Sequence, residues 1–399
     1  MVVSYSEIKS RYDLEIKKVT DNKLAYITHY LQNIGDNSAE YFRTEAEKHL
    51  SNCDFNLNKI KWNVPFPPTE NPKFKFIDLF AGIGGMRMAF QNLGGKCVFS
   101  SEWDLYAQKT YYENYGEVPF GDITEIDENN IPDHEVLVAG FPCQAFSIAG
   151  RRGGFEDTRG TLFFDVARII KAKRPRAIFL ENVKGLVNHD KGKTLKVILN
   201  TLRNDLGYYV PEPQIINAVN FGVPQNRERI FIVGFSPETG INEFNYPTPN
   251  PTNLRFIDIR EENPVSVKYY LSTQYLETLR NHKARHQEKG NGFGYAIIPD
   301  EGIASAIVVG GMGRERNLVI DHRLTDFTPV TKIKGEVNRE GIRNMTPREW
   351  ARLQGFPNEF NIVVSDTQAY KQFGNSVAVP AVQATANEVI NNLLGVGVV

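Results

Sequence analysis

The spacing of apolar and polar residues divides the chain into a patterned centre and two less regular flanks. Between residues 74 and 235, short apolar runs rich in β-branched residues alternate with stretches that have helical spacing. The apolar runs predict strands at residues 74–80, 96–103, 134–140, 176–183 and 227–235. Such alternation is typical of βαβ units, so we expect an α/β fold with a mostly parallel sheet.

The flanking regions lack this alternation. Residues 1–72 are polar, with helix-like stretches such as AEYFRTEAEKHL, and end in the proline-rich stretch WNVPFPPTENP, which predicts an extended linker. Residues 236–344 are rich in Pro, Gly, Asn and Tyr, which predicts a small, irregular, β-rich domain. Residues 345–399 are helical again, with a first-turn signal at Thr346, and we expect them to return to the central domain of residues 73–235.

Composition and charge narrow the class of protein. The 399 residues carry a formal net charge of -1, so a nucleic-acid partner must be held by a local basic patch. Three widely spaced cysteines, Cys53, Cys97 and Cys143, form neither a disulfide framework nor a zinc ligand set, and we expect no metal site. No apolar run approaches the length of a membrane span and no signal-peptide core is present, so we expect no membrane contact and a cytoplasmic location.

A glycine-rich turn and two acidic residues indicate a cofactor site. The segment FIDLFAGIGG joins the first strand to the first helix through Gly82, Gly84 and Gly85, which let the backbone approach a ligand. Glu102 ends the next strand, where a carboxylate can bond a ribose hydroxyl, and Trp103 offers a face for an adenine. Asp122 can accept from an adenine amino group. These residues predict a cofactor that contains adenosine, without distinguishing which one.

Two reactive side chains follow neighbouring strands at the same edge of the predicted sheet. Cys143 lies just past an apolar strand, where a lone cysteine is more often only a small hydrophobic residue. Glu181 and Asn182 close the next apolar strand. A glutamate in an apolar pocket has a raised pKa, so it can give a proton to a heteroaromatic nitrogen. A thiolate that adds to the adjacent ring carbon would then perform nucleophilic catalysis on a pyrimidine.

A series of motifs in a fixed order extends this interpretation. The segments FIDLFAGIGG, EW, GDI, GFPCQAFSIAG, ENV, QNRERIFIVGF, MTPREWARLQGFP and AYKQFGNSVAVP closely resemble the ordered motifs of bacterial DNA cytosine-C5 methyltransferases. The resemblance extends from residue 74 to about residue 395, and its specificity comes from the number and order of the motifs. It implies a Rossmann-like domain that uses S-adenosylmethionine, with S-adenosylhomocysteine as product, and a target-recognition domain between QNRER and TPREW.

The resemblance also implies roles for individual residues. Cys143 is similar to the nucleophile that adds to cytosine C6, Glu181 to the acid at N3, and Asn182 to a residue that supports the loop. Arg229, with Arg227 near it, resembles the arginine that helps to hold the glutamate and the cytosine O2. The positions that match cofactor-binding residues are Phe80, Gly82, Gly84, Gly85, Glu102, Trp103, Asp122, Ile123, Pro142, Leu162, Asn375 and Ser376.

The implied substrate is double-stranded DNA. A cytosine inside a duplex hides its C5 and C6 atoms in the stack, so the base must be flipped out to reach the thiol. Gln144 and Ser147 belong to the segment that resembles the loop closing over DNA. The family further implies a monomer that protects host DNA from a cognate restriction endonuclease without binding it directly. Residues 1–70 lie outside the motifs, so we expect a helical cap or an extension that methylation does not require.

Residues 290–343 resemble the recognition segments of methylases that modify CCGG sites. Within them, Arg314 and Arg316 follow flexible glycines in the stretch GGMGRER. Arginine can bond guanine O6 and N7 in the major groove, while Glu315 can accept from a cytosine amino group. The alternative is that both arginines contact only phosphates, which account for much of any protein–DNA interface.

Three other functions compete with this interpretation. An RNA cytosine-C5 methyltransferase would share the fold, although the long variable segment before MTPREW favours duplex DNA. A nicotinamide-dependent oxidoreductase would explain the glycines and Glu102 but not the PCQ and ENV motifs. A DNA-binding relative without activity is expected to lose Cys143 or Glu181, and both are present.

Overall fold

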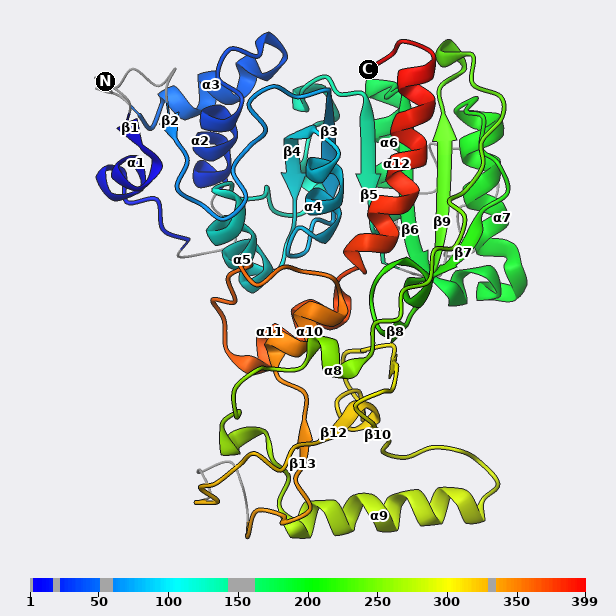
Figure 1. Ribbon diagram of the computed structural model, residues 1–399. Helices are drawn as coiled ribbons and strands as arrows, with labels where there is room; N and C mark the ends of the chain where they lie inside the picture. Colours follow the sequence, from blue (N-terminus) through cyan, green and yellow to red (C-terminus); the bar gives the residue numbers. More distant parts are fainter. Residues whose placement is uncertain (1–2, 17–21, 51–59, 143–161, 329–334) are drawn as a thin grey trace.

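The computed structural model describes residues 3–16, 22–50, 60–142, 162–328 and 335–399. At its centre lies a six-stranded sheet with the order β4-β3-β5-β6-β9-β7 (Figure 1). Its strands are β3 (Phe74–Leu79), β4 (Gly95–Ser101), β5 (Val136–Ala139), β6 (Ala177–Val183), β7 (Gln214–Asn217) and β9 (Glu228–Phe235). Strands β4, β3, β5 and β6 pair in parallel, and β9 runs antiparallel to both of its neighbours, β6 and β7. The predicted α/β fold with a mostly parallel sheet is confirmed.

The strands coincide with the apolar runs because both faces of the sheet are covered. All four residues of β5 are buried. Alternate residues of β3, β5 and β6 point into two different apolar clusters, one on each face. Such two-sided burial is what continuous apolar runs indicate. Strand β7 escaped prediction because it lies at the edge of the sheet, and Gln214 and Ile215 are exposed there.

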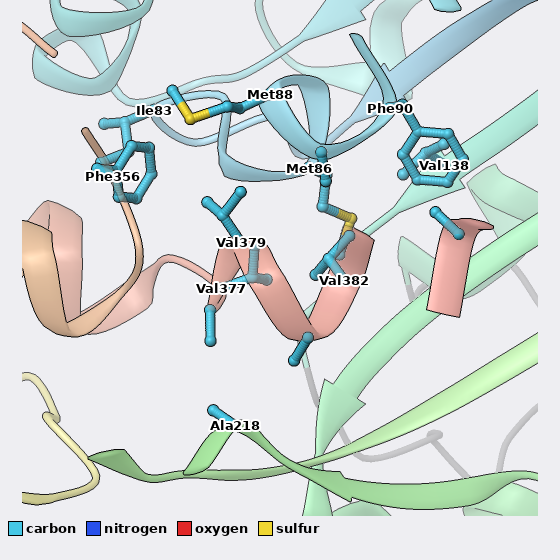
Figure 2. Close-up of a cluster of buried hydrophobic side chains, with 14 of the residues drawn as sticks. Ile83, Met86, Met88, Phe90, Val138, Ala218, Phe356, Val377, Val379 and Val382 are labelled. Atoms are coloured by element: carbon cyan, nitrogen blue, oxygen red, sulfur yellow. The ribbon is translucent and has the colours of Figure 1, made fainter. Parts of the chain in front are cut away.

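Helices from residues 73–235 and from the C-terminal segment cover the sheet. One face carries α4 (Gly85–Asn92) and α12 (Val379–Gly395), and the other carries α6 (Leu162–Lys173) and α7 (Lys193–Asn200). Figure 2 shows Met86 of α4 lying against Val382 of α12. The last part of the chain therefore returns to the central domain. Helix α5 (Leu105–Tyr115) follows β4 and contributes Ala107, Tyr111 and Tyr115 to the same apolar cluster as α12.

The N-terminal residues pack against the edge of the sheet that β4 forms (Figure 1). They form α1 (Tyr5–Arg11), α2 (Lys23–Gln32) and α3 (Glu40–Glu47), and β1 (Val3–Ser4) pairs with β2 (Ile60–Lys61). Ala25 and Phe42 belong to the same buried cluster as Phe99 of β4 and Phe120. The extension is helical, as predicted. The expectation that methylation does not require this extension stays a prediction, although its removal would expose part of this cluster to water.

The region between the two parts of the central domain has little regular structure. Its strands β10 (Ile297–Ile298), β11 (Ala304–Ser305), β12 (Leu318–Ile320) and β13 (Ile342–Asn344) have two or three residues each. Its helices are α8 (Phe256–Ile259), α9 (Thr273–Glu288), α10 (Pro347–Leu353) and α11 (Asp366–Asn375), the last two leading back to the central domain. The 16-residue α9, at the far end of this region in Figure 1, escaped prediction because only Leu276 and Leu279 of it are buried. The β-rich description is therefore incomplete.

The strand β8 (Gln225–Asn226) connects this region to the catalytic core, because it pairs with β11. Within the ranges that the structure describes, no helix has the length and apolar character needed to cross a membrane.

Candidate active site

A cavity of about 1600 Å³ lies at the carboxyl edge of the sheet, which is where open α/β sheets bind ligands. Residues that follow β3, β4, β5 and β6 line it, together with residues 371–377 at the end of α11. Small-molecule pockets usually measure roughly 300–1,000 Å³, so this cavity has room for a cofactor and a nucleobase together. Every residue predicted to bind the cofactor lines the cavity except Gly84.

The turn after β3 places backbone atoms at the cavity wall. Phe80 has a φ of 58°, a conformation that costs a residue with a Cβ about 1–3 kcal/mol and is common at functional sites. The amide of Gly82 donates to Oε2 of Glu102 at 2.8 Å. Gly84 has a φ of 83°, and a Cβ there would lie 2.3 Å from the ring of Tyr115. Gly84 therefore shapes the start of α4 and does not line the cavity.

Glu102 and Trp103 form the wall that follows β4. The Glu102 carboxylate is 9% exposed and also accepts from the amide of Asp104 at 2.7 Å. Burial raises its pKa, and the backbone hydrogen bonds oppose that effect. Each carboxylate oxygen has two lone pairs, so the side chain can still accept from a pair of hydroxyls. The indole of Trp103 is 73% exposed and leaves an aromatic face for stacking.

Asp122 lies on the same wall as Glu102. The amide of Glu102 donates to the carbonyl of Phe120 at 2.8 Å, which places the chain before Asp122 beside the end of β4. Asp122 caps a short 3₁₀ turn by accepting from the amide of Thr124 at 2.9 Å. Ile123 is buried beside it. Acidic groups from two chain segments therefore face one part of the cavity.

Glu181 and Arg229 form an ion pair at the opposite end of the cavity. Arg229 Nε lies 3.0 Å from Glu181 Oε1, and the Glu181 side chain is 9% exposed. Burial raises the pKa of Glu181, while the charges of Arg229 and Arg227 lower it. The direction of the net shift is upward, so this carboxyl group retains a proton at higher pH than a solvated glutamate. It is equipped to act as an acid.

The ends of β5 and β6 bring the cysteine-bearing segment beside this acid. Ala139 pairs with Leu180, and a Cβ on Gly140 would lie 3.6 Å from Glu181 Oε2. Asn182 donates from Nδ2 to the carbonyl of Phe141 at 2.8 Å, which supports its predicted role in holding the loop. Pro142 lines the cavity. Cys143, Gln144 and Ser147 lie outside the described residues.

Arg227 does not contact Glu181, unlike its neighbour Arg229. It is 1% exposed and donates to the carbonyls of Ile307, Gly374 and Ser376 at 2.8, 3.1 and 2.5 Å. Burial lowers its pKa to about 9, and the charge of Arg229 adds to this effect. The structure thus places Arg227 as a tie between the catalytic strand, the recognition region and the end of α11, which is a positioning role.

The arginines proposed to read DNA bases are exposed, and the acid between them is not. Arg314 lies over the ring of Tyr370 and Arg316 over that of Phe293, with 5.4 and 5.8 Å between guanidinium carbon and ring centroid. Glu315 is buried and accepts from the hydroxyl of Tyr275 at 3.0 Å. Glu315 lies in a short 3₁₀ turn with its side chain buried, and its expected contact with a cytosine amino group stays a prediction.

Some cavity residues escaped sequence reasoning. Lys371 forms an ion pair with Asp104 at 2.6 Å, and both line the cavity. Arg168 lines it as well and is paired with Glu128 and Asp165. Helical spacing marks these positions only as surface residues, because Asp104 and Glu128 are distant in sequence from their partners Lys371 and Arg168.

These features define the class of protein as an α/β enzyme with a cofactor-sized cavity that ends at a buried acid. The sequence profile described as "C-5 cytosine-specific DNA methylase" matches residues 74–391. The type II methyltransferase M.HpaII of Haemophilus parainfluenzae is 71% identical over 334 residues, which cover 82% of this chain and 93% of the relative. M.BsuFI of Bacillus subtilis is 46% identical over 374 residues, covering 93% of this chain and 86% of the relative.

A solved structure also shares the fold. The crystal structure of the S. pombe Dnmt2 methyltransferase superimposes with a TM-score of 0.61 at 18% identity, covering 81% of this chain and 99% of that one. The chain belongs to the C-5 cytosine-specific DNA methylase family. It is a DNA cytosine-C5 methyltransferase, and the high identity to a type II DNA methyltransferase favours this function over the RNA alternative and over an oxidoreductase.

Proposed function

We propose that the cavity binds S-adenosylmethionine beside a flipped cytosine and that the enzyme methylates C5 of that base. The observation that carries this proposal is that one cavity joins the predicted cofactor residues to Glu181 and Asn182. Glu102 would bond the ribose hydroxyls, Trp103 would stack on the adenine and Asp122 would accept from its amino group. When bound, S-adenosylmethionine supplies an electrophilic methyl group.

The protein groups activate the base in two coupled steps. The Cys143 thiolate adds to C6 while Glu181 protonates N3, which makes C5 nucleophilic. Arg229, paired with Glu181, lies where it can hold the carboxyl group and bond the cytosine O2. After C5 has taken up the methyl group, loss of the C5 proton to a base, departure of the thiolate and return of the N3 proton to Glu181 restore the aromatic ring and the starting state of the enzyme.

The thiol is tested by substitution and by trapping. We expect Cys143→Ala to abolish turnover while DNA binding persists, because the thiolate forms a bond and contributes little affinity. Wild-type enzyme should form a stable covalent adduct with DNA containing 5-fluorocytosine. Carbon C5 of that base carries fluorine in place of hydrogen, so there is no C5 proton to remove and the thiolate stays bound. Cys97→Ala is the matched control, because Cys97 is buried in the core and its thiol pKa is raised by burial. Methylation by Cys143→Ala at near wild-type rate would refute the mechanism.

The relatives are named as type II methyltransferases, so we also propose a place in a restriction–modification system. In this role a monomer in the bacterial cytoplasm methylates chromosomal DNA and protects it from a cognate endonuclease without binding that enzyme. The proposed target is CCGG, from the resemblance of residues 290–343 to recognition segments. Two exposed arginines within that segment support it, since guanine is the base that arginine bonds bidentately.

The target assignment makes a specific prediction for Arg314→Ala and Arg316→Ala. Loss of a base contact costs roughly 1–3 kcal/mol at one position of the site, whereas loss of a phosphate contact weakens all sequences alike. We therefore expect selective loss of CCGG preference, measured by bisulfite sequencing and by binding to CCGG and scrambled duplexes. Arg280→Ala is the control, because Arg280 pairs with Glu340 in the same region. Equal weakening on both duplexes would refute base reading by these arginines.

A further inference from the structure

The N-terminal segment, whose described residues are 3–16 and 22–50, bonds directly to the chain that leads into one wall of the cavity. Four of its side chains make hydrogen bonds to backbone groups of residues 115–121. Tyr5 Oη donates to the carbonyl of Gly116, and Gln32 Nε2 donates to the carbonyl of Tyr115, each at 2.7 Å. In the other direction, the amide of Val118 donates to Thr28 Oγ1 at 3.0 Å, and the amide of Gly121 donates to Asn22 Oδ1 at 3.3 Å. The bonds come from α1, from α2 and from Asn22, the residue before α2.

A buried ion pair strengthens this connection. Arg87 and Glu117 are fully buried and 2.9 Å apart, and a buried pair of this kind is stable only when its remaining donors and acceptors have partners. Gln32 Oε1 accepts from Arg87 Nη2 at 2.8 Å, while Nε2 of the same side-chain amide donates to the carbonyl of Tyr115. His29 accepts from the amide of Ser100 through Nε2 at 3.1 Å. Helix α2 therefore supplies a partner to Arg87 and also holds Ser100, whose hydroxyl donates to Glu117 at 2.6 Å.

The same contacts lead to the residues that line the cavity. The Phe120 ring packs against Tyr26, His29 and Phe42 of the N-terminal segment, with centroid separations of 5.0, 4.7 and 5.4 Å. The Phe120 carbonyl accepts from the amide of Glu102. The chain continues directly into Asp122 and Ile123 at the cavity. A shift of residues 115–121 would therefore move the groups on this wall.

We propose that the N-terminal segment positions the wall that receives the adenosine part of the cofactor, with Thr28 and Gln32 as positioning residues. The proposal rests on the assignment of S-adenosylmethionine to this cavity. The family profile begins only at residue 74, so it does not include these contacts. The match to M.BsuFI covers 93% of the chain and must include part of the first 73 residues.

The experiment compares two threonines that differ in one respect. Thr28 and Thr385 are both fully buried, and each hydroxyl donates to the carbonyl four residues earlier. Only Thr28 also accepts from the wall, at Val118. Thr28→Val in the full-length protein should raise the dissociation constant for S-adenosylhomocysteine roughly threefold to tenfold, measured by calorimetry, because one buried amide loses its partner. Thr385→Val should leave it within twofold.

A purely stabilising role would give a different result. We expect the turnover number of Thr28→Val at saturating cofactor to stay within twofold of wild type, and hydrogen exchange at residues 118–122 to be faster than in Thr385→Val. Gln32→Met should raise the dissociation constant further, because it removes two bonds. Equal affinity of Thr28→Val and wild type would overturn this proposal alone. Failure of wild-type protein to bind S-adenosylhomocysteine would overturn the proposed function, and this proposal with it.

Discussion

Glu181 is subject to opposing influences that together suit it to proton transfer. Burial in the cavity wall raises its pKa, and the charges of Arg229 and Arg227 limit that rise. The ion pair also orients the carboxyl group, because Arg229 holds Oε1 and leaves Oε2 toward Gly140 and the cysteine-bearing segment. A solvated glutamate at the same position would be almost fully ionised at neutral pH and would lack a proton to give.

At this scale we predict a large effect of Glu181→Gln. An amide can hydrogen-bond to N3 but cannot transfer a proton, so the single-turnover rate should fall roughly a hundredfold or more with cofactor affinity retained. The wild-type rate should decline as pH rises through the raised pKa of Glu181, because the acid form is lost. The variant should lack that decline. Unchanged single-turnover methylation would show that Glu181 has only a structural role.

Three elements that are remote in sequence meet at β8 and the start of β9. The side chain of Gln225 accepts from the backbone amide of Ile307 at 3.0 Å, and Arg227 donates to the backbone carbonyl of Ile307. Both backbone groups of Ile307 are therefore hydrogen-bonded to residues of the central domain. Arg227 also holds the carbonyls of Gly374 and Ser376, which line the cavity. Residues 236–344 and the cavity are therefore connected through one buried guanidinium.

We predict that Arg227→Met destabilises the junction of these elements. The substitution removes the Arg227 donor from three buried backbone carbonyls, of which that of Ser376 still accepts from Gln354, and should lower the free energy of unfolding by about 2–4 kcal/mol. Urea denaturation measures this change. Arg43→Met is the control, because Arg43 forms exposed ion pairs with Glu40 and Glu47, and the free energy of unfolding should change little when they are lost. A variant as stable as wild type would contradict the role of Arg227 as a tie.

For the whole molecule, buried histidines make stability depend on pH. Burial lowers the pKa of His134 to about 4, well below the value of 6.5 for an exposed imidazole. The unfolded chain therefore binds a proton at His134 that the native protein excludes. Stability contributed by the neutral form is present above pH 6.5 and is lost as pH falls toward 4, by at most about 3 kcal/mol.

We predict that His134→Gln makes the free energy of unfolding less dependent on pH. Between pH 6.5 and 4 the free energy of unfolding should decrease less steeply in the variant than in the wild-type protein, as measured by urea titrations at each pH. Burial raises the pKa of Asp78 to about 7, which gives it the opposite pH dependence, so the difference between the two proteins isolates His134. Parallel pH profiles would show that His134 is not excluded from protonation.

The sequence by itself determined the central sheet and most of the cavity. Apolar runs bounded by glycine or proline predict buried strands because a strand covered on both faces excludes polar side chains. Glu181 and Asn182 were located because reactive residues follow strands at one edge, and parallel strands bring their carboxyl ends together. Among the predicted cofactor residues, only Gly84 lies outside the cavity lining. A glycine is needed there because a Cβ would clash with the ring of Tyr115.

The tertiary structure alone decided which contacts form between segments that are distant in the sequence. Nothing local distinguishes Arg227 from Arg229, yet one ties backbone carbonyls and the other pairs with Glu181, since the partners come from residues far along the chain. Helix α9 has only two buried apolar residues, Leu276 and Leu279, so its docking cannot be predicted from the apolar pattern. Hydrogen bonds such as that from Val118 to Thr28 join residues 90 positions apart, and packing, which depends on the whole fold, determines such pairs.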